Sequence, residues 1–442
     1  MVISFSDALS RAPLKAFSVA TFVICMLVLV ADGMDAQVLG IVAPIVIEEF
    51  GIDRGTFGIA MSAALVGFGI GSWGGGWLGD TIGRRWSLAL ATVVFSLATV
   101  AASQAGDVWQ MAGWRVVGGL GFGSAYANAI ALAGEWLPAR WRSVGVTTLS
   151  VGTPAGGLLV AALAPTLVEL YGWRGSFIIF GIGTFLVVLL IVFVLRDSPS
   201  FLLARGKVEE ARSAAARVIE GPLELEAERH HTDREGGSIG VFDRSNLRLN
   251  LGIGIAFAAA TTCAYGILNW TTTMLTAQGF SFEEASYAVS VAGLTSIAVS
   301  IAAGLLIQRF GSKPVVASFS ALLVLTFLAL AYKVETLPEV PGEGDGLPIV
   351  VLIGLSATFF SGSIASFYAM MTHAYPPSCR SAGIGFGIFV GRAGAIAASG
   401  LGGWLLDLGQ GSVLPFFAVM IVAAVLIQSA AFVVDRHVPP TR

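Results

Sequence analysis

The chain has 442 residues, of which 55% are hydrophobic and only 12% are charged, whereas about 25% of the residues of a typical soluble domain are charged. Its mean hydropathy is +0.82. This composition excludes a soluble globular protein, which needs more charges to cover its surface. The net charge of −3 gives no sign of a nucleic-acid partner. We expect an integral membrane protein in contact with lipid.

A transmembrane helix needs about 20 consecutive apolar residues. Six such runs precede a charged stretch and six follow it. They lie near residues 17–46, 56–78, 86–105, 111–134, 143–168 and 174–195, then 249–275, 285–307, 314–333, 348–373, 381–406 and 413–434. The sequence therefore predicts an all-α membrane protein with twelve transmembrane helices. We divide it into an N-terminal half (1–195), a central loop with short amphipathic helices (196–248) and a C-terminal half (249–442).

The positions of lysine and arginine predict the orientation, because cytoplasmic segments carry an excess of these residues. If both termini are cytoplasmic, twenty of the 25 cations fall on the inner side, nine of them in the central loop. The outer connections are acidic instead. We expect a multi-pass protein of the cell (inner) membrane with both termini in the cytoplasm.

The motifs of several other functional classes are missing from the sequence. The three cysteines and four histidines have neither disulfide nor metal-ligand spacing, so we expect no metal and no cofactor. There is no Gly-x-x-x-x-Gly-Lys-Ser/Thr, Gly-x-Ser-x-Gly or His-Glu-x-x-His motif. This argues against an ATP-driven pump and an intramembrane enzyme.

One loop motif occurs twice, at corresponding places in the two halves. The loop between spans 2 and 3 reads Gly76-Trp-Leu-Gly-Asp80-Thr-Ile-Gly83-Arg84-Arg85, and the loop between spans 8 and 9 reads Gly304-Leu-Leu-Ile-Gln308-Arg309-Phe-Gly311-Ser-Lys313. Secondary transporters are often built from such repeats, with the substrate site near the midplane between them.

The repeated loop resembles the signature loop of the major facilitator superfamily. Within that superfamily, the chain resembles the aromatic acid:proton symporters along nearly its whole length. The resemblance rests on Asp32-Gly-Met-Asp35 in span 1, Arg115 to Gly123 and Glu135 in span 4, Gly152 to Gly157 in span 5, Asp197-Ser-Pro199 after span 6, and Tyr375-Pro376, Arg380 and Gly391-Arg392-Ala-Gly394 around spans 10 and 11. It implies a conformational latch at Gly76, Asp80, Gly83, Arg84 and Arg85, and gating or loop-anchoring roles for Glu135 and Arg380.

Four charged residues fall inside the predicted spans: Asp32, Asp35, Arg115 and Arg392. An ionisable residue at this depth is expensive and therefore indicates function. A carboxylate there can carry a proton, and an arginine can bind a substrate carboxylate through two hydrogen bonds. We predict proton coupling at Asp32 and Asp35 and substrate binding at Arg115 and Arg392. The alternative is a fixed ion pair between one of the acids and Arg115.

Polar and aromatic side chains in spans 7 and 10 are further candidates for the substrate site. Asn269 and Trp270 are predicted to bind substrate, and Tyr265, Phe367 and Tyr368 are candidates for lining the site. Aromatic walls suit a flat aromatic substrate. The alternative is packing or interfacial anchoring, for which Trp and Tyr are also common.

We therefore expect a monomeric symporter that imports an organic acid, specifically an aromatic acid such as a hydroxybenzoate, together with a proton. Two alternatives stay open from the sequence. One is an exporter or antiporter with the same fold, and the other is a membrane sensor that transports nothing. A sensor usually has a soluble output domain, and the longest hydrophilic stretch here is the central loop.

Overall fold

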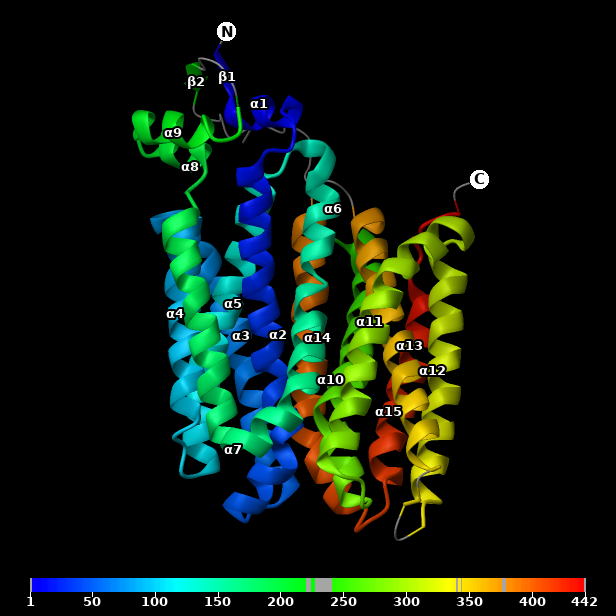
Figure 1. Cartoon of the computed structure of the whole chain (residues 1–442). Helices are drawn as coiled ribbons and strands as arrows, with labels where there is room; N and C mark the ends of the chain where they lie inside the picture. The colour runs from blue at the N-terminus through cyan, green and yellow to red at the C-terminus, as the bar shows by residue number, and fades with distance from the viewer. Residues whose placement is uncertain are drawn as a thin grey trace.

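The computed structural model describes residues 2–219, 224–226, 241–338, 341–342, 344–375 and 379–440. The long helices run side by side along one common direction, and both ends of the chain lie at the same end of the bundle (Figure 1). We call that end the terminal face and the opposite end the far face.

The first half of the chain forms six helices after a short N-terminal segment. That segment holds β1 (Val2–Ser4) and α1 (Phe5–Arg11), and the helices are α2 (Ala16–Phe50), α3 (Arg54–Ile82), α4 (Arg84–Ala102), α5 (Val108–Trp136), α6 (Ala139–Leu149) and α7 (Gly152–Val194). The second half holds α10 (Leu247–Ala277), α11 (Phe282–Phe310), α12 (Ser312–Glu335), α13 (Gly346–Ala374), α14 (Arg380–Leu408) and α15 (Leu414–Val433).

These helices account for all twelve predicted spans. Ten described helices are long and apolar enough to cross a membrane. One of them, α7, has 43 residues and bends at Gly172, whose φ is 67°, so it contains the fifth and sixth spans. The 20-residue helix α15 supplies the twelfth.

The fifth span differs from the prediction, because residues 143–168 are not one continuous helix. α6 ends at Leu149 and α7 begins at Gly152, with a turn between them. Pro154 explains the break. Proline has no backbone N–H, and its ring would clash with the carbonyl of residue 150 in a continuous helix. The break places the first turn of α7 beside the middle of α2.

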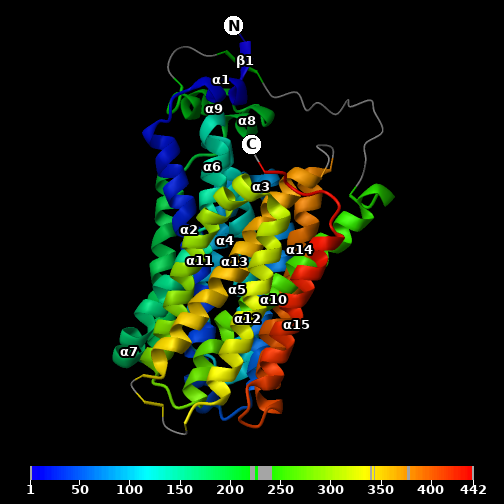
Figure 2. The same cartoon turned by 90° about the vertical axis from the view of Figure 1, so that its right-hand side faces the viewer.

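The connection between the halves folds over the terminal face. It contains α8 (Pro199–Ala204), α9 (Val208–Ala215), β2 (Glu224–Glu226) and the 3₁₀ helix η1 (Arg244–Asn246). β2 pairs in parallel with β1, with Val2 opposite Glu224. α1, α8 and α9 gather at this end in both views (Figures 1 and 2).

Glycines bring the helices of the first half unusually close together. A Cβ added to Gly33 of α2 would lie 2.0 Å from the carbonyl oxygen of Thr153 in α7, and one added to Gly156 would lie 2.0 Å from that of Val30. Gly119 of α5 packs in the same way against Ala64 of α3. Small residues allow this approach in membranes, where packing drives helix association.

We expect Gly33→Ala to destabilise the protein by roughly 1–3 kcal/mol, because the new methyl group has no space. Gly113 of α5 is the matched control, since a Cβ there meets nothing within 4 Å. Gly113→Ala should be neutral or slightly stabilising. The thermal unfolding midpoint in detergent measures both changes. Equal midpoints for the two variants would contradict the packing at Gly33.

Candidate functional site

Asp35 and Arg115 form a buried ion pair inside the N-terminal half. The guanidinium Nη1 of Arg115 donates to Asp35 Oδ2, and its Nη2 donates to the Asp35 carbonyl at 3.1 Å. Thr99 of α4 donates its hydroxyl to Asp35 Oδ1 at 2.5 Å. Both charged residues are at least 95% buried. The pair therefore ties α2, α4 and α5 together and leaves Arg115 engaged within its own half.

Asp32 has different surroundings, although it lies only one helical turn from Asp35. It sits near the middle of α2 and accepts a hydrogen bond of 3.2 Å from the Thr153 hydroxyl, in the first turn of α7. Arg392 of the opposite half lies within electrostatic range of it. Asp32 is therefore the acid of span 1 that, among the described residues, has no ion pair with an arginine of its own half and has a cation of the other half nearby.

Arg392 lies near the middle of α14, in an aromatic setting. Its guanidinium carbon is 3.8 Å from the centre of the Phe68 ring, which belongs to the N-terminal half. Its Nη1 donates to the Tyr265 hydroxyl at 3.1 Å. Tyr126 and Tyr368 are close enough to interact with it electrostatically. A cation so placed is held by neutral groups and keeps its charge available for an anion.

The other two predicted binding residues follow each other on α10. Asn269 is 4% exposed and donates its amide nitrogen to Ser399 Oγ of α14 at 2.8 Å. Trp270 is fully buried, and its indole N–H donates to the Ala398 carbonyl at 3.2 Å. Trp270 thus packs between helices of its own half. Among the candidate lining residues, Phe367 is fully buried, whereas Tyr265 and Tyr368 are partly exposed.

The two halves touch along α3 and α14 from the far face to the middle of these helices. Near the far face, Arg54 lies 3.9 Å from Asp407, and the backbone N–H of Gly55 donates to the same carboxylate at 3.0 Å. Gly58 packs against Gly400, and Phe68 meets Arg392 midway. Toward the terminal face the helices separate. A Cβ at Gly69 or Gly76 of α3, or at Gly385 of α14, would meet nothing within 4 Å.

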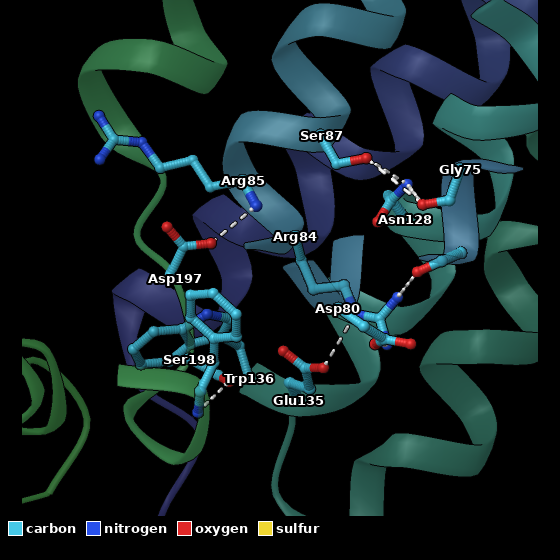
Figure 3. A network of polar contacts seen from close by, with 12 residues as sticks. Gly75, Asp80, Arg84, Arg85, Ser87, Asn128, Glu135, Trp136, Asp197 and Ser198 are labelled. Carbon is cyan, nitrogen blue, oxygen red and sulfur yellow. Dashed lines mark hydrogen bonds and ion pairs between the residues drawn. The ribbon is translucent and has the colours of Figure 1, made fainter. Parts of the chain in front are cut away.

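The repeated loop of the first half forms a polar network at the terminal face (Figure 3). Arg84 donates to Asp80 at 2.5 Å and lies 3.5 Å from Glu135 at the end of α5. Its Nη1 also reaches the Gly76 carbonyl at 3.5 Å. One guanidinium thus joins the end of α3 to the end of α5 and brings Gly76, Asp80, Arg84 and Glu135 together.

Asp197, which follows α7, fastens the same loop from the other side (Figure 3). Its carboxylate accepts the backbone N–H of Arg85 at 2.9 Å. Gly83 allows this approach, because its φ is 101° and a Cβ there would lie 2.5 Å from Asp197 Oδ1. In the second half, the segment after the last helix also holds the repeated loop, but through a backbone carbonyl. The N–H of Ser312, next to Gly311, donates to the Val438 carbonyl at 3.0 Å, after α15.

Two further expectations concern the side chain of Arg380 and a metal site. The predicted gating role of Arg380 depends on a side chain outside the described residues, and only its backbone is placed, at the start of α14. Within the described ranges, no group of three or more His, Cys, Asp or Glu side chains could hold a metal ion.

Sequence reasoning missed several residues of the site. Phe68, Tyr126, Thr99 and Thr153 carry no charge, so nothing in an apolar run distinguishes them from ordinary packing residues. Thr153 had one available signal, because it lies beside Pro154, where a helix break frees a side chain to reach a neighbouring helix.

We expect Arg115→Met to cost roughly 3–5 kcal/mol of stability, because it leaves the Asp35 carboxylate buried without its cation. Adding Asp35→Asn should recover much of this loss, since the double variant leaves no buried charge. Thermal unfolding of both variants measures the effect, with Arg309→Met at an exposed site as the control. Equal losses in the single and double variants would contradict the ion pair.

A pH dependence should arise at Asp197, which lies outside the spans. Burial raises the pKa of its carboxyl, against the lowering effect of the Arg85 N–H and the charge of Arg85. The folded state therefore binds this proton more tightly than the unfolded state. The associated stability is present at low pH and is lost as the pH rises through the raised pKa.

Asp197→Asn keeps the acceptor and has no such loss. We expect its unfolding midpoint, relative to the wild type, to be more favourable at pH 7 than at pH 4. Asp197→Ala removes the acceptor as well, and should be destabilised at both pH values by about 1–3 kcal/mol. A difference between Asp197→Asn and the wild type that does not change with pH would count against this account.

Comparison with known proteins places these features in a family. The sequence model described as Major Facilitator Superfamily matches residues 25–336 and 251–442. The gallate transporter of Pseudomonas putida is 27% identical over 94% of this chain and 91% of its own length. The 4-hydroxybenzoate transporter PcaK of Pseudomonas aeruginosa is 26% identical over 91% of this chain and 89% of its own.

Solved structures agree on the fold. The crystal structure of a D-xylose-proton symporter superposes with a TM-score of 0.73 at 18% identity, covering 97% of this chain and 99% of that one. An inward-open conformation of the xylose transporter XylE from E. coli gives a TM-score of 0.70 at 18% identity, covering 94% and 95%. The predicted fold class and the predicted resemblance to aromatic acid transporters are confirmed. The chain belongs to the major facilitator superfamily and is a multi-pass membrane transporter, not an enzyme.

Proposed function

We propose that this transporter is a symporter that carries an aromatic acid into the cell together with a proton. The observation that carries the proposal is the pair of opposite charges at mid-span, Asp32 in one half and Arg392 in the other. Each lies near the middle of its helix. Relatives that transport 4-hydroxybenzoate and gallate support the substrate class.

The two acids of span 1 take different roles in this proposal. Asp35 has its charge balanced by Arg115 and a further hydrogen bond from Thr99. Asp32 has a single hydroxyl donor, Thr153, and no arginine of its own half in direct contact among the described residues. We therefore assign the transported proton to the Asp32 carboxylate and treat Asp35 as part of the scaffold.

Arg392 is the anchor for the substrate carboxylate. Phe68 and Tyr265 hold its guanidinium without neutralising it. When Asp32 is ionised, its carboxylate competes with the substrate carboxylate for electrostatic attraction to Arg392. When Asp32 is protonated, it no longer competes, and the substrate carboxylate binds Arg392. Proton and anion then cross together, with no net change of charge in the site. The proton gradient serves as the energy source, and no cofactor is involved.

We place the protein in the inner membrane with its terminal face in the cytoplasm. The described parts of the central loop and both repeated loops lie at this face and carry many of the cations, as the positive-inside rule favours for a cytoplasmic face. The contact between α3 and α14 then closes the outer side, and the helices separate toward the cytoplasm. With the orientation that we propose, the structure corresponds to an inward-facing state of the alternating-access cycle.

Asp32→Asn mimics the protonated acid and tests the assignment. In proteoliposomes, we expect it to lose accumulation of labelled 4-hydroxybenzoate driven by an inward proton gradient. It should keep exchange of the same acid when no gradient is imposed. Arg392→Met should lose both activities, because it lacks the anion anchor. Asp243→Asn, in the exposed central loop, is the matched control and should behave as the wild type.

Full gradient-driven accumulation by Asp32→Asn would overturn the coupling mechanism. If the wild type takes up none of 4-hydroxybenzoate, gallate and benzoate, the substrate class is wrong. Export of the acid against the gradient would instead establish the opposite direction of transport.

A further inference from the structure

Two buried side-chain amides near the middle of the protein have an oxygen without a hydrogen-bond donor among the described residues. They are Oε1 of Gln37 in α2 and Oδ1 of Asn269 in α10. Gln37 is 8% exposed and Asn269 is 4% exposed. Buried polar atoms in native structures almost always have a partner, so an unpartnered one calls for an explanation. Neither amide is used by the proton and carboxylate chemistry proposed above.

The two amides lie on α2 and α10, which touch across the boundary between the halves at Gly40 and Asn269. The Gln37 side chain lies beside Gly157 of α7, at which a Cβ would come within 3.0 Å of Gln37 Cγ. Gly40, nearly one turn beyond Gln37, lies against Asn269, and a Cβ on it would be 3.3 Å from the Asn269 oxygen. The two glycines let α2 pack closely against α7 and α10 beside these amides.

Their height in the bundle relates them to the anion anchor. On α10, Asn269 is four residues from Tyr265, which bonds Arg392, and this spacing corresponds to a rise of about 6 Å toward the far face. On α2, Gln37 is five residues from Asp32, a rise of about 7.5 Å in the same direction. Both distances are comparable to the length of a benzene ring with two para substituents.

Resting on the proposed function, we propose that Gln37 is a specificity-determining residue: its amide oxygen accepts the hydrogen bond that a ring hydroxyl donates at the end of the substrate opposite the carboxylate held by Arg392, and Asn269 lines the same end of the site. Ser399 fixes the other end of the Asn269 amide. A hydroxyl group both donates and accepts, so it complements an amide whichever end faces it. An acid without this hydroxyl leaves the buried Gln37 oxygen without a donor.

Three substituted benzoates test whether the site requires a hydrogen-bond donor at the para position. Benzoate has no para substituent, 4-hydroxybenzoate has a donor there, and 4-methoxybenzoate has an oxygen at the same position that cannot donate. We expect the wild type in proteoliposomes to take up 4-hydroxybenzoate with a KM at least about tenfold lower than that for either other acid, as for a site that binds a substrate hydroxyl.

Gln37→Met keeps the length of the side chain and removes its oxygen. We expect it to bring the KM ratio of benzoate to 4-hydroxybenzoate close to one, chiefly by raising the KM for 4-hydroxybenzoate, while proton-driven uptake of benzoate persists. Asn269→Leu should shift the ratio in the same direction. Gln278→Met, the same replacement at the far-face end of α10, is the matched control and should leave the ratio unchanged.

The outcomes distinguish this proposal from the function on which it rests. A Gln37→Met protein that transports both acids and keeps the wild-type ratio would overturn the role of Gln37. Equal KM values for all three acids in the wild type would overturn it even if neither variant folds, and would leave aromatic acid symport standing. Failure of the wild type to take up any of the three acids would instead overturn the proposed function.

Discussion

A charged side chain at the centre of a bilayer costs about 3 kcal/mol on insertion scales. The arrangement of this transporter follows from the groups that compensate each such charge. The N-terminal half holds Asp32, Asp35 and Arg115, of which two neutralise each other. The C-terminal half holds Arg392, whose contacts are a phenyl ring and a phenol. One half thus carries an acid in excess and the other a cation in excess. Their attraction acts across the surface on which the halves must move.

The rest of the fold keeps this surface movable while each half stays rigid. Glycines let α2 pack on α7 and α3 on α5 in the first half, and α14 on α10 in the second, with backbone contact, so each half moves as a unit. At the terminal face, the segment after the last helix of each half holds the repeated loop, through Asp197 in the first and Val438 in the second. The fastening is similar although its chemistry differs, because both loops turn at a glycine with positive φ, Gly83 and Gly311.

The sequence was sufficient for whatever depends on hydropathy and charge alone: twelve spans, two halves and four intramembrane charges. It could not tell which acid pairs with Arg115. Asp32 and Asp35 are three residues apart and lie on one broad face of α2, and only the rotation of that helix against α5 and α7 separates their partners. For the same reason Phe68 could not be predicted, since its contact with Arg392 joins residues more than 300 positions apart. The break in span 5 was readable at Pro154, but a hydropathy run does not register it.

The roles that we propose assign proton coupling and substrate selectivity to different residues. The charged groups, Asp32 and Arg392, act through long-range electrostatics, and any small carboxylate satisfies them equally well. Selectivity between acids has to come from neutral groups that act only at contact, such as the tyrosines around Arg392 and the amides one turn farther along α2 and α10. Residues of the second kind can change without altering how the proton is used. If coupling and selectivity depend on different residues, related transporters can carry different aromatic acids, such as 4-hydroxybenzoate and gallate. A substrate with a new ring substituent then requires new neutral side chains around the ring, while the two charged residues stay the same.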